Sequence, residues 1–350
     1  MTFRPGSCPT LALLAAIIAC LPQPRTHARA AKIPREVLAF YYGWYGNPTT
    51  SGQWVHWNGV DTANEHIDNS TDFPAFGPYD SHDPAILVRQ TQAAHAAGIT
   101  GFIASWWGQG SFEDRGLPLL LSAAAKQGLA VSVYYEKIDG ADPTTRKRSA
   151  IADLDYLLAH YANSKAWLRA EGKPVIFVYG RALGELAPTD WHQVMAQVRG
   201  DNPHGIRLVA DSLDHAFVSV FDGASVYNIT GQTQHKSPPQ IQAWARVAYP
   251  RMVDAAALFF DKISTVTVIP GYDDRHLGRP PPRPVTDRWG GDSYAALWRE
   301  AIAAAPDYVL ITSWNEWHEG SELEPSVEYG SRILDDTAAF ARSFLGRKPR

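Results

Sequence analysis

The sequence predicts a (β/α)8 barrel with long loops at one end, and three observations support the prediction. Eight short apolar runs rich in β-branched and aromatic residues recur along the chain, and helical patterns separate most of them. The runs are continuous rather than alternating, which is typical of parallel strands buried on both faces. Most runs end on polar or aromatic residues, as expected at the carboxyl end of a barrel. A doubly wound open sheet is the alternative, but no glycine-rich phosphate-binding turn follows the first run.

The predicted elements alternate in regular order. The strands are residues 37–42, 99–105, 129–135, 174–179, 206–211, 224–229, 266–270 and 308–313. The helices are residues 84–97, 117–127, 148–170, 188–199, 237–248 and 292–305. The first helix has the clearest limits, because Asp83 can cap it, Pro84 fits its first position and Gly98 ends it.

Two connections are unusually long. Residues 43–82 and 271–291 show little periodicity, and each follows a predicted strand. Long irregular loops in compact domains are usually functional or disordered, and the aromatic residues of the first loop favour function. Loops that follow barrel strands lie at the end that holds active sites. We therefore expect both loops to border the site.

The N-terminus has the pattern of an export signal. Arg4 precedes an apolar stretch at residues 11–21 that is too short to span a bilayer, and residues 28–30 form a small-x-small cleavage site. Residues 17–20 also resemble a lipobox ending at Cys20. We therefore expect a signal at 1–30, a single domain at 31–350, and a secreted or periplasmic protein that is free or lipid-anchored at Cys20.

Composition narrows the partners. The formal net charge is −4, so no basic surplus points to nucleic acid. His56, His66 and His82 lack the paired spacing of a zinc site, and we expect neither metal nor cofactor. The chain has 12 Trp and 15 Tyr. Indole faces stack on the apolar faces of sugars, and carboxylates handle hydroxyls and glycosidic oxygens, so strand ends bearing both predict a carbohydrate site.

The strongest signal is the pair Glu316 and Glu319, which follows the eighth predicted strand. In a helical turn the two side chains lie on one side, about 5–6 Å apart at Cβ. Two carboxylates so close cannot both ionise easily, so one serves as acid and the other as base. The alternative is that both glutamates are ordinary exposed acids of a solvated loop. The apolar strand directly before the pair, and the neighbouring residues Trp314, Trp317 and Gly320, argue against it.

Other strand ends give weaker signals. Glu136 is either a catalytic helper or the partner of a nearby basic residue. Trp106 and Trp107 cannot both face the site if the strand pleat continues through them, so one should stack on the ligand and the other pack against a helix.

Three further acidic residues have structural interpretations. We expect Asp211 to cap a helix that begins near residue 213. Glu322 and Glu324 are expected to fix the loop that follows the catalytic pair.

Five segments together resemble glycoside hydrolase family 99, the endo-α-1,2-mannosidase and endomannanase group, and its WbsX-type bacterial relatives. The segments are FYYGWYGNP (40–48), DPAILVRQTQAAHAAGITGF (83–102), ASWWG (104–108), VYYEK (133–137) and VLITSWNEWHEGSELEPS (309–326). They occur in the family's order over most of the chain. The resemblance implies a (β/α)8 barrel, in agreement with the strand count.

The resemblance also implies a retaining mechanism without an enzyme nucleophile. One glutamate removes the proton of the sugar 2-hydroxyl, which attacks the anomeric carbon to give a 1,2-anhydro sugar. The other protonates the leaving oxygen and then activates water. By motif, Glu316 matches the base and Glu319 the general acid/base, while Glu136 and one of Trp106 or Trp107 match residues that line the −1 and −2 subsites.

We therefore expect a secreted endo-α-mannosidase-like hydrolase. Two alternatives remain at this point: the same mechanism on another glycan, and a sugar-binding or polysaccharide-assembly protein without turnover. The partner is an oligo- or polysaccharide. The expected catalytic residues are Glu316 and Glu319, and the expected substrate-binding residues are Glu136, Trp106, Trp107, Tyr41, Tyr42, Trp44, Tyr227, Tyr272, Asn315 and Trp317.

Overall fold

The computed structural model describes residues 33–257 and 262–346, which form one compact unit. The predicted signal at 1–30 and the candidate lipid attachment at Cys20 lie outside the described residues. None of the helices in the described part of the chain is both long and apolar enough to cross a membrane.

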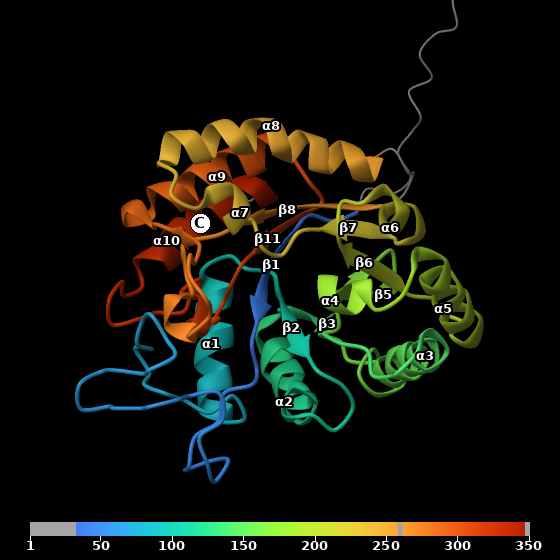
Figure 1. The fold of residues 1–350 in the computed structure, drawn as a ribbon, viewed down its shortest axis with the longest axis horizontal. Coiled ribbons are helices and arrows are strands. Elements are labelled where there is room, and N and C mark those ends of the chain that lie inside the picture. The colour runs from blue at the N-terminus through green and yellow to red at the C-terminus, as the bar shows by residue number, and fades with distance from the viewer. Residues whose placement is uncertain (1–32, 258–261, 347–350) are drawn as a thin grey trace, which may run out of the picture. The chain divides into compact units, whose positions relative to one another are not determined.

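Eight parallel strands close into a barrel surrounded by helices (Figure 1). The barrel strands are β1 (Glu36–Tyr41), β2 (Gly101–Trp106), β3 (Ala130–Tyr135), β5 (Lys173–Val178), β6 (Arg207–Asp211), β7 (Gly223–Ser225), β8 (Ile263–Val268) and β11 (Tyr308–Ile311). Each pairs with the next, and the ring closes because β1 pairs with β11 as well as β2. The (β/α)8 prediction is confirmed, and all eight predicted strands overlap observed ones.

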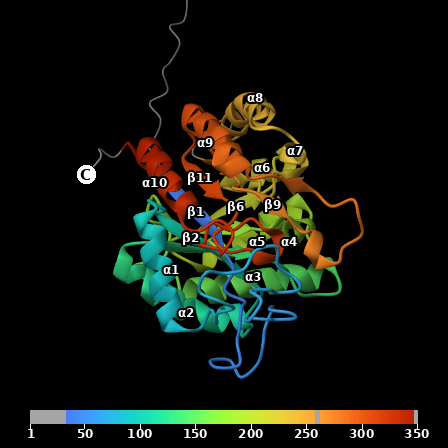
Figure 2. The same ribbon diagram turned by 90° about the vertical axis from the view of Figure 1, so that its left-hand side faces the viewer.

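The longer helices occupy the outside of the ring (Figures 1 and 2). They are α1 (Pro84–Ala96), α2 (Phe112–Gln127), α3 (Pro143–His160), α5 (Pro188–Asp201), α8 (Pro238–Ala257), α9 (Asp292–Ala304) and α10 (Arg332–Leu345). Shorter elements are α4 (Gly180–Gly184), α6 (His215–Val220), α7 (Thr230–Thr233), β4 (Arg169–Ala170), β9 (Tyr272–Asp273), β10 (Val285–Thr286), η1 (Arg275–Leu277), η2 (Trp289–Gly291) and η3 (Trp317–Glu319).

Helix α3 corrects the predicted span of 148–170. It begins earlier because the Asp142 side chain accepts hydrogen bonds from the first-turn amides and Pro143 occupies the first helical position. It ends at His160, and β4 instead pairs antiparallel with β5. The apolar residues beyond the helix, including Trp167, are buried in an irregular segment. Their apolar pattern therefore reflects burial and not a continuing helix.

The strand pleat separates two packed layers. In β1, Leu38 and Phe40 pack inside the barrel, whereas Val37 and Ala39 join the layer between the strands and the helices. Because side chains alternate along a strand, Tyr42 follows the inner set and Tyr41 the outer set. The long loop after β1, residues 43–82, projects beyond the helices as a blue trace (Figures 1 and 2).

Candidate active site

A cavity of about 340 Å³ lies at the carboxyl ends of the strands. Its walls come from the carboxyl ends of seven barrel strands and the segments that follow them. The lining residues are Tyr42, Trp44, His56, Trp107, Tyr134, Glu136, Tyr179, Arg181, Tyr227, Leu277, Arg279, Glu316, His318 and Glu319. A second cavity of about 500 Å³ shares Tyr179, Tyr227, Arg279 and Glu319 with it. Glu319 therefore stands where the two cavities meet.

The turn that carries the predicted pair is anchored before and after η3. Ser313 Oγ accepts a hydrogen bond from the Glu316 amide at 2.7 Å. The Asn315 side chain accepts from the Tyr42 amide at 2.7 Å and donates to the Tyr42 carbonyl at 2.9 Å, which ties the turn to the end of β1. Gly320 closes the turn with φ of 55° and lies against the Asp273 backbone, so a side chain there would be both strained and crowded.

Glu316 is buried, and one of its two carboxylate oxygens is held by its own turn. Oε1 accepts from the His318 amide at 3.2 Å and lies 3.2 Å from His318 Nδ1. Burial lowers the pKa of His318, but the hydrogen bond and the charge of Glu316 outweigh it, so the pKa is raised overall. The His318 Nε2 lies 2.9 Å from the carbonyl of His56.

Glu319 has a different set of partners. Tyr227 donates its hydroxyl to Oε2 at 2.9 Å, and Tyr272 donates to Oε1 at 3.2 Å. Burial and then the charge of Glu316 raise the pKa of Glu319 to about 7, although these hydrogen bonds oppose the shift. A carboxyl with such a pKa can be protonated in one step and ionised in the next, as a general acid/base requires.

Glu136 forms part of the opposite wall. Its Oε1 accepts from Ser105 Oγ at 2.8 Å, and Ser105 Oγ in turn accepts from Trp107 Nε1 at 3.0 Å. Burial raises the pKa of Glu136 to about 8, although Ser105 and the Arg181 guanidinium, 3.9 Å from Oε2, oppose the shift. Arg181 also lies 4.8 Å from the centre of the Trp107 ring. The carboxylate and the indole are therefore held as one unit.

The aromatic wall comes from the loop after β1. Trp44 and His56 stack with ring centres 4.5 Å apart and planes 5° from parallel. Trp44 lies 6.4 Å from Trp107, at 44°. The two indoles provide flat faces of the kind on which sugar rings stack.

The structure brings eight of the twelve predicted residues to these two cavities and separates four from them. Those at the cavities are Glu316, Glu319, Glu136, Trp107, Tyr42, Trp44, Tyr227 and Tyr272. The expectation of substrate contact is corrected for Tyr41, Trp106, Asn315 and Trp317, which are at most 2% exposed and line neither cavity.

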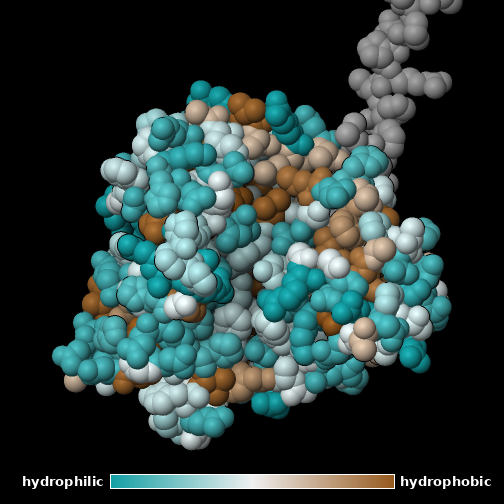
Figure 3. Space-filling model, viewed as in Figure 1, coloured by the Kyte–Doolittle hydropathy of each residue, from teal (hydrophilic) through white to brown (hydrophobic). Residues whose placement is uncertain are grey.

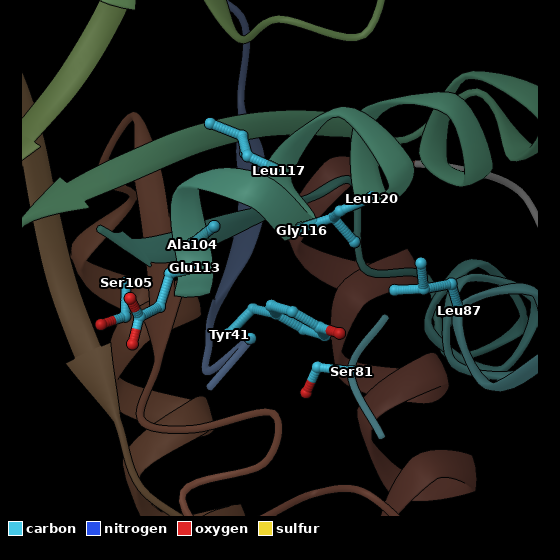
Figure 4. Close-up of a pocket in the computed structure, with 10 residues that line it drawn as sticks. Tyr41, Ser81, Leu87, Ala104, Ser105, Glu113, Gly116, Leu117 and Leu120 are labelled. Carbon is cyan, nitrogen blue, oxygen red and sulfur yellow. The ribbon is translucent and has the colours of Figure 1, made fainter. Parts of the chain in front are cut away.

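These four residues support the site from behind. Trp106 faces the helical layer and donates Nε1 to Asp114 of α2, and Trp317 donates Nε1 to the Tyr79 hydroxyl. Tyr41 lines a separate cavity of about 10 Å³, room for roughly one water, with Ser81 and Leu87 (Figure 4). The pleat of β1 and β2 explains why the outer residue of each aromatic pair points away from the site.

Of the predictions for the three further acidic residues, two are confirmed and one is wrong. Glu324 accepts from Tyr79 and Gln90, both at 2.7 Å, and Glu322 pairs with Arg288, so both fix the loop as expected. The Asp211 interpretation is wrong, because Asp214 caps α6. Asp211 instead accepts from the Tyr227 amide at 2.7 Å and from the Tyr134 hydroxyl at 2.8 Å.

Sequence reasoning missed His56, His318 and Arg279 as lining residues. His318 stands between the two glutamates, and this position was a usable signal. His56 and Arg279 lie in the two long loops, where no periodicity indicates which side chains turn inward.

A groove elsewhere on the surface has a different character. It measures about 420 Å³ and is lined by Leu213 and residues of α8, including Trp244 and Val247. Figure 3 shows brown, apolar residues in the region of α8 and α6. The groove has no carboxylate in its lining, so it lacks the acid–base groups of the cavity at the strand ends.

Comparison with known proteins agrees with this geometry. Residues 33–338 match glycosyl hydrolase family 99. The chain is 27% identical to the mouse glycoprotein endo-alpha-1,2-mannosidase-like protein, over 87% of this chain and 72% of the relative. It is 26% identical to the mouse glycoprotein endo-alpha-1,2-mannosidase, over 91% and 74% respectively.

A solved structure shares both the sequence and the fold. The GH99 endo-alpha-mannosidase from Bacteroides thetaiotaomicron, in complex with bis-tris-propane, superposes with a TM-score of 0.75 at 25% identity, covering 88% of this chain and 97% of that one. The match to the family extends over both the barrel and the loop that carries the two glutamates. The chain therefore belongs to glycosyl hydrolase family 99 and is a glycoside hydrolase.

Proposed function

We propose that the protein is an endo-acting α-mannosidase that hydrolyses α-mannosyl glycans with retention through a 1,2-anhydro sugar. The observation that carries the proposal is that Glu316 and Glu319 share one cavity but have different partners. Glu316 has an oxygen bound by its own turn, whereas Glu319 is held by two tyrosine hydroxyls and has a pKa raised to about 7 by burial and the charge of Glu316.

In the first step Glu316 accepts the proton of the sugar 2-hydroxyl while O2 attacks the anomeric carbon. The bond from that carbon to the leaving oxygen breaks, and Glu319 gives its proton to this oxygen. In the second step Glu319 accepts a proton from water, whose oxygen attacks the anomeric carbon. The C1–O2 bond opens, and Glu316 returns its proton to O2. Both glutamates end in their starting states, so the cycle balances.

The surrounding walls support sugar binding. Trp44 and Trp107 offer stacking faces, and Glu136 offers hydrogen bonds to hydroxyls from a fixed position. Because Glu319 protonates the leaving oxygen, the adjoining cavity with Tyr272 and Arg279 takes the leaving-group side. Two adjoining cavities that share four lining residues suit cleavage within a chain rather than at its end.

Product analysis tests the proposal. The protein is incubated with an α-mannan, an α-1,2-linked glucosyl-mannose glycan and a β-mannan, and the products are followed by mass spectrometry and by NMR of the anomeric signal. We expect oligosaccharides from α-linked substrates, released with retained configuration. Cleavage of the β-mannan alone, or inverted products, would reject the proposal.

A fluorinated substrate tests the intermediate. If O2 is the nucleophile, an activated 2-fluoro mannoside has no attacking oxygen and should be inert. Intact-protein mass spectrometry should then show no added mass. A stable adduct on Glu316 would identify it as a conventional nucleophile instead.

A further inference from the structure

His318 has no part in the reaction steps above, yet both of its ring nitrogens face oxygen acceptors. Nε2 lies 2.9 Å from the main-chain carbonyl of His56. Nδ1 lies 3.2 Å from Oε1 of Glu316. The side chain is 8% exposed, so little water competes for either nitrogen.

This geometry discriminates between the forms of the imidazole. A neutral ring has one N–H and one lone pair, whereas the imidazolium has two N–H donors. Either neutral tautomer would place a nitrogen lone pair against an oxygen, because a carbonyl and an ionised carboxylate only accept hydrogen bonds. The imidazolium satisfies both contacts, and it pairs its charge with Glu316 in a buried setting where an unpaired charge is costly.

The neighbouring groups agree with a single cation at this position. From its own turn His318 faces Glu316 and Glu319, and from the loop after β1 it faces His56 and Tyr45. Burial and the charge of His318 lower the pKa of His56 to about 4, so His56 stays neutral. Burial also raises the pKa of Tyr45 well above its ordinary value, so its hydroxyl keeps its proton.

We propose that His318 is a charged positioning residue: an imidazolium, held by the His56 carbonyl, that binds Oε1 of Glu316 and leaves Oε2 as the oxygen that takes up the substrate proton. Two donors of His318, the main-chain amide and Nδ1, face Oε1. Within residues 33–257 and 262–346 no protein donor is hydrogen-bonded to Oε2. The catalytic part of this inference rests on the proposed function, whereas the protonation of His318 does not.

Nitrogen NMR of the labelled protein tests the protonation directly. The ring signals of His318 are identified by their loss in His318→Gln. We expect both ring nitrogens of the wild-type protein to carry protons at pH 7, and we expect His318 to become neutral at this pH in Glu316→Gln. A neutral His318 ring in the wild type at pH 7, or an imidazolium that persists in Glu316→Gln, would overturn the assignment.

The pH dependence of kcat/KM tests the effect on catalysis. In His318→Gln the ionised form of Glu316 loses its cationic neighbour, so the acid limb should move upward by about one pH unit or more. A purely structural role would lower activity without moving this limb, and that outcome would reject the positioning role. His82→Gln is the matched control, because the Nε2 of His82 also faces a carbonyl, that of Phe112 at 2.9 Å, without contact with the catalytic turn.

The two measurements separate the present inference from the proposed function. If no mannoside is hydrolysed but the wild-type ring is doubly protonated through Glu316, only the substrate and reaction are wrong. If mannan is cleaved and the ring is neutral, only the role of His318 is wrong. The NMR comparison needs no turnover, so it stands even if His318→Gln has too little activity for kinetics.

Discussion

The first four glutamates after β11 form two pairs with opposite surroundings. Glu316 and Glu319 face the cavity, whereas Glu322 and Glu324 face the protein behind it. Burial raises the pKa of Glu324 to about 7, the same value that burial and the charge of Glu316 give Glu319. A perturbed pKa therefore does not distinguish the proposed acid catalyst, Glu319, from a structural carboxyl in this loop.

The partners of each pair make the distinction. Both oxygens of Glu324 are held, by the Tyr79 hydroxyl and the Gln90 amide, and neither can reach a ligand. Glu322 pairs with Arg288, which also donates to the carbonyls of Gly320 and Glu322. The rear pair, Glu322 and Glu324, thus fixes the backbone that presents the front pair, Glu316 and Glu319. Only the front pair has access to a substrate.

The largest effect should follow removal of the acid at the front. Glu319→Gln keeps the size of the side chain but cannot donate or accept the catalytic proton, so kcat on a natural glycan should fall by about 10²–10⁴-fold. Glu324→Gln should lose less than about tenfold, equivalent to 1.4 kcal/mol. Steady-state kinetics with both variants, with substrate binding measured by calorimetry, checks the comparison. Equal losses of kcat in Glu319→Gln and Glu324→Gln would show that the two pairs of glutamates do not differ in function.

A smaller effect should appear in stability at the rear. The folded-state pKa of Glu324 is raised by burial to about 7 from an ordinary value of 4.5, so the folded protein holds this proton more tightly than the unfolded chain. The contribution of Glu324 to stability is therefore greatest below pH 4.5 and falls as the pH rises to 7, by up to about 1.4 kcal/mol per pH unit.

Denaturant unfolding at pH 4.5 and 7.5 measures this contribution as the difference between the wild type and Glu324→Gln. The advantage of the wild type should shrink at the higher pH, because the neutral amide of the variant has no charge to bury. An advantage that grows with pH would mean that Glu324 is ionised favourably in the folded protein.

The smallest effect concerns the two indoles at the end of β2, Trp106 and Trp107. Trp107→Ala removes a stacking face from the cavity, so KM should rise by about threefold to tenfold, the equivalent of one aromatic contact. Trp106→Phe removes the hydrogen bond to Asp114 instead, and should cost about 1–3 kcal/mol of stability with KM unchanged. Steady-state kinetics and thermal unfolding of both variants check these expectations. If Trp106→Phe raised KM and Trp107→Ala lowered only the stability, the roles assigned to the two indoles would be reversed.

The sequence by itself determined the barrel and the end of the barrel at which the site lies. Continuous apolar runs separated by capped helices were enough for the fold, because parallel buried strands require that pattern. The pleat, a period of two, also predicted that only one of Trp106 and Trp107 faces the site, and the structure shows that this residue is Trp107. The spacing of Glu316 and Glu319 after the last strand identified the pair because both positions depend on one short turn.

Only the tertiary structure decided which groups surround each carboxyl. The partners of Glu319 come from the segments after β7 and β8, and the carbonyl that holds His318 is 262 residues away along the chain. Local propensity cannot specify such contacts, because irregular loops have no period from which the inward side can be read. The long loop after β1 adopts its course by packing against the η3 turn, and that packing turns His56 and Trp44 into walls of the site.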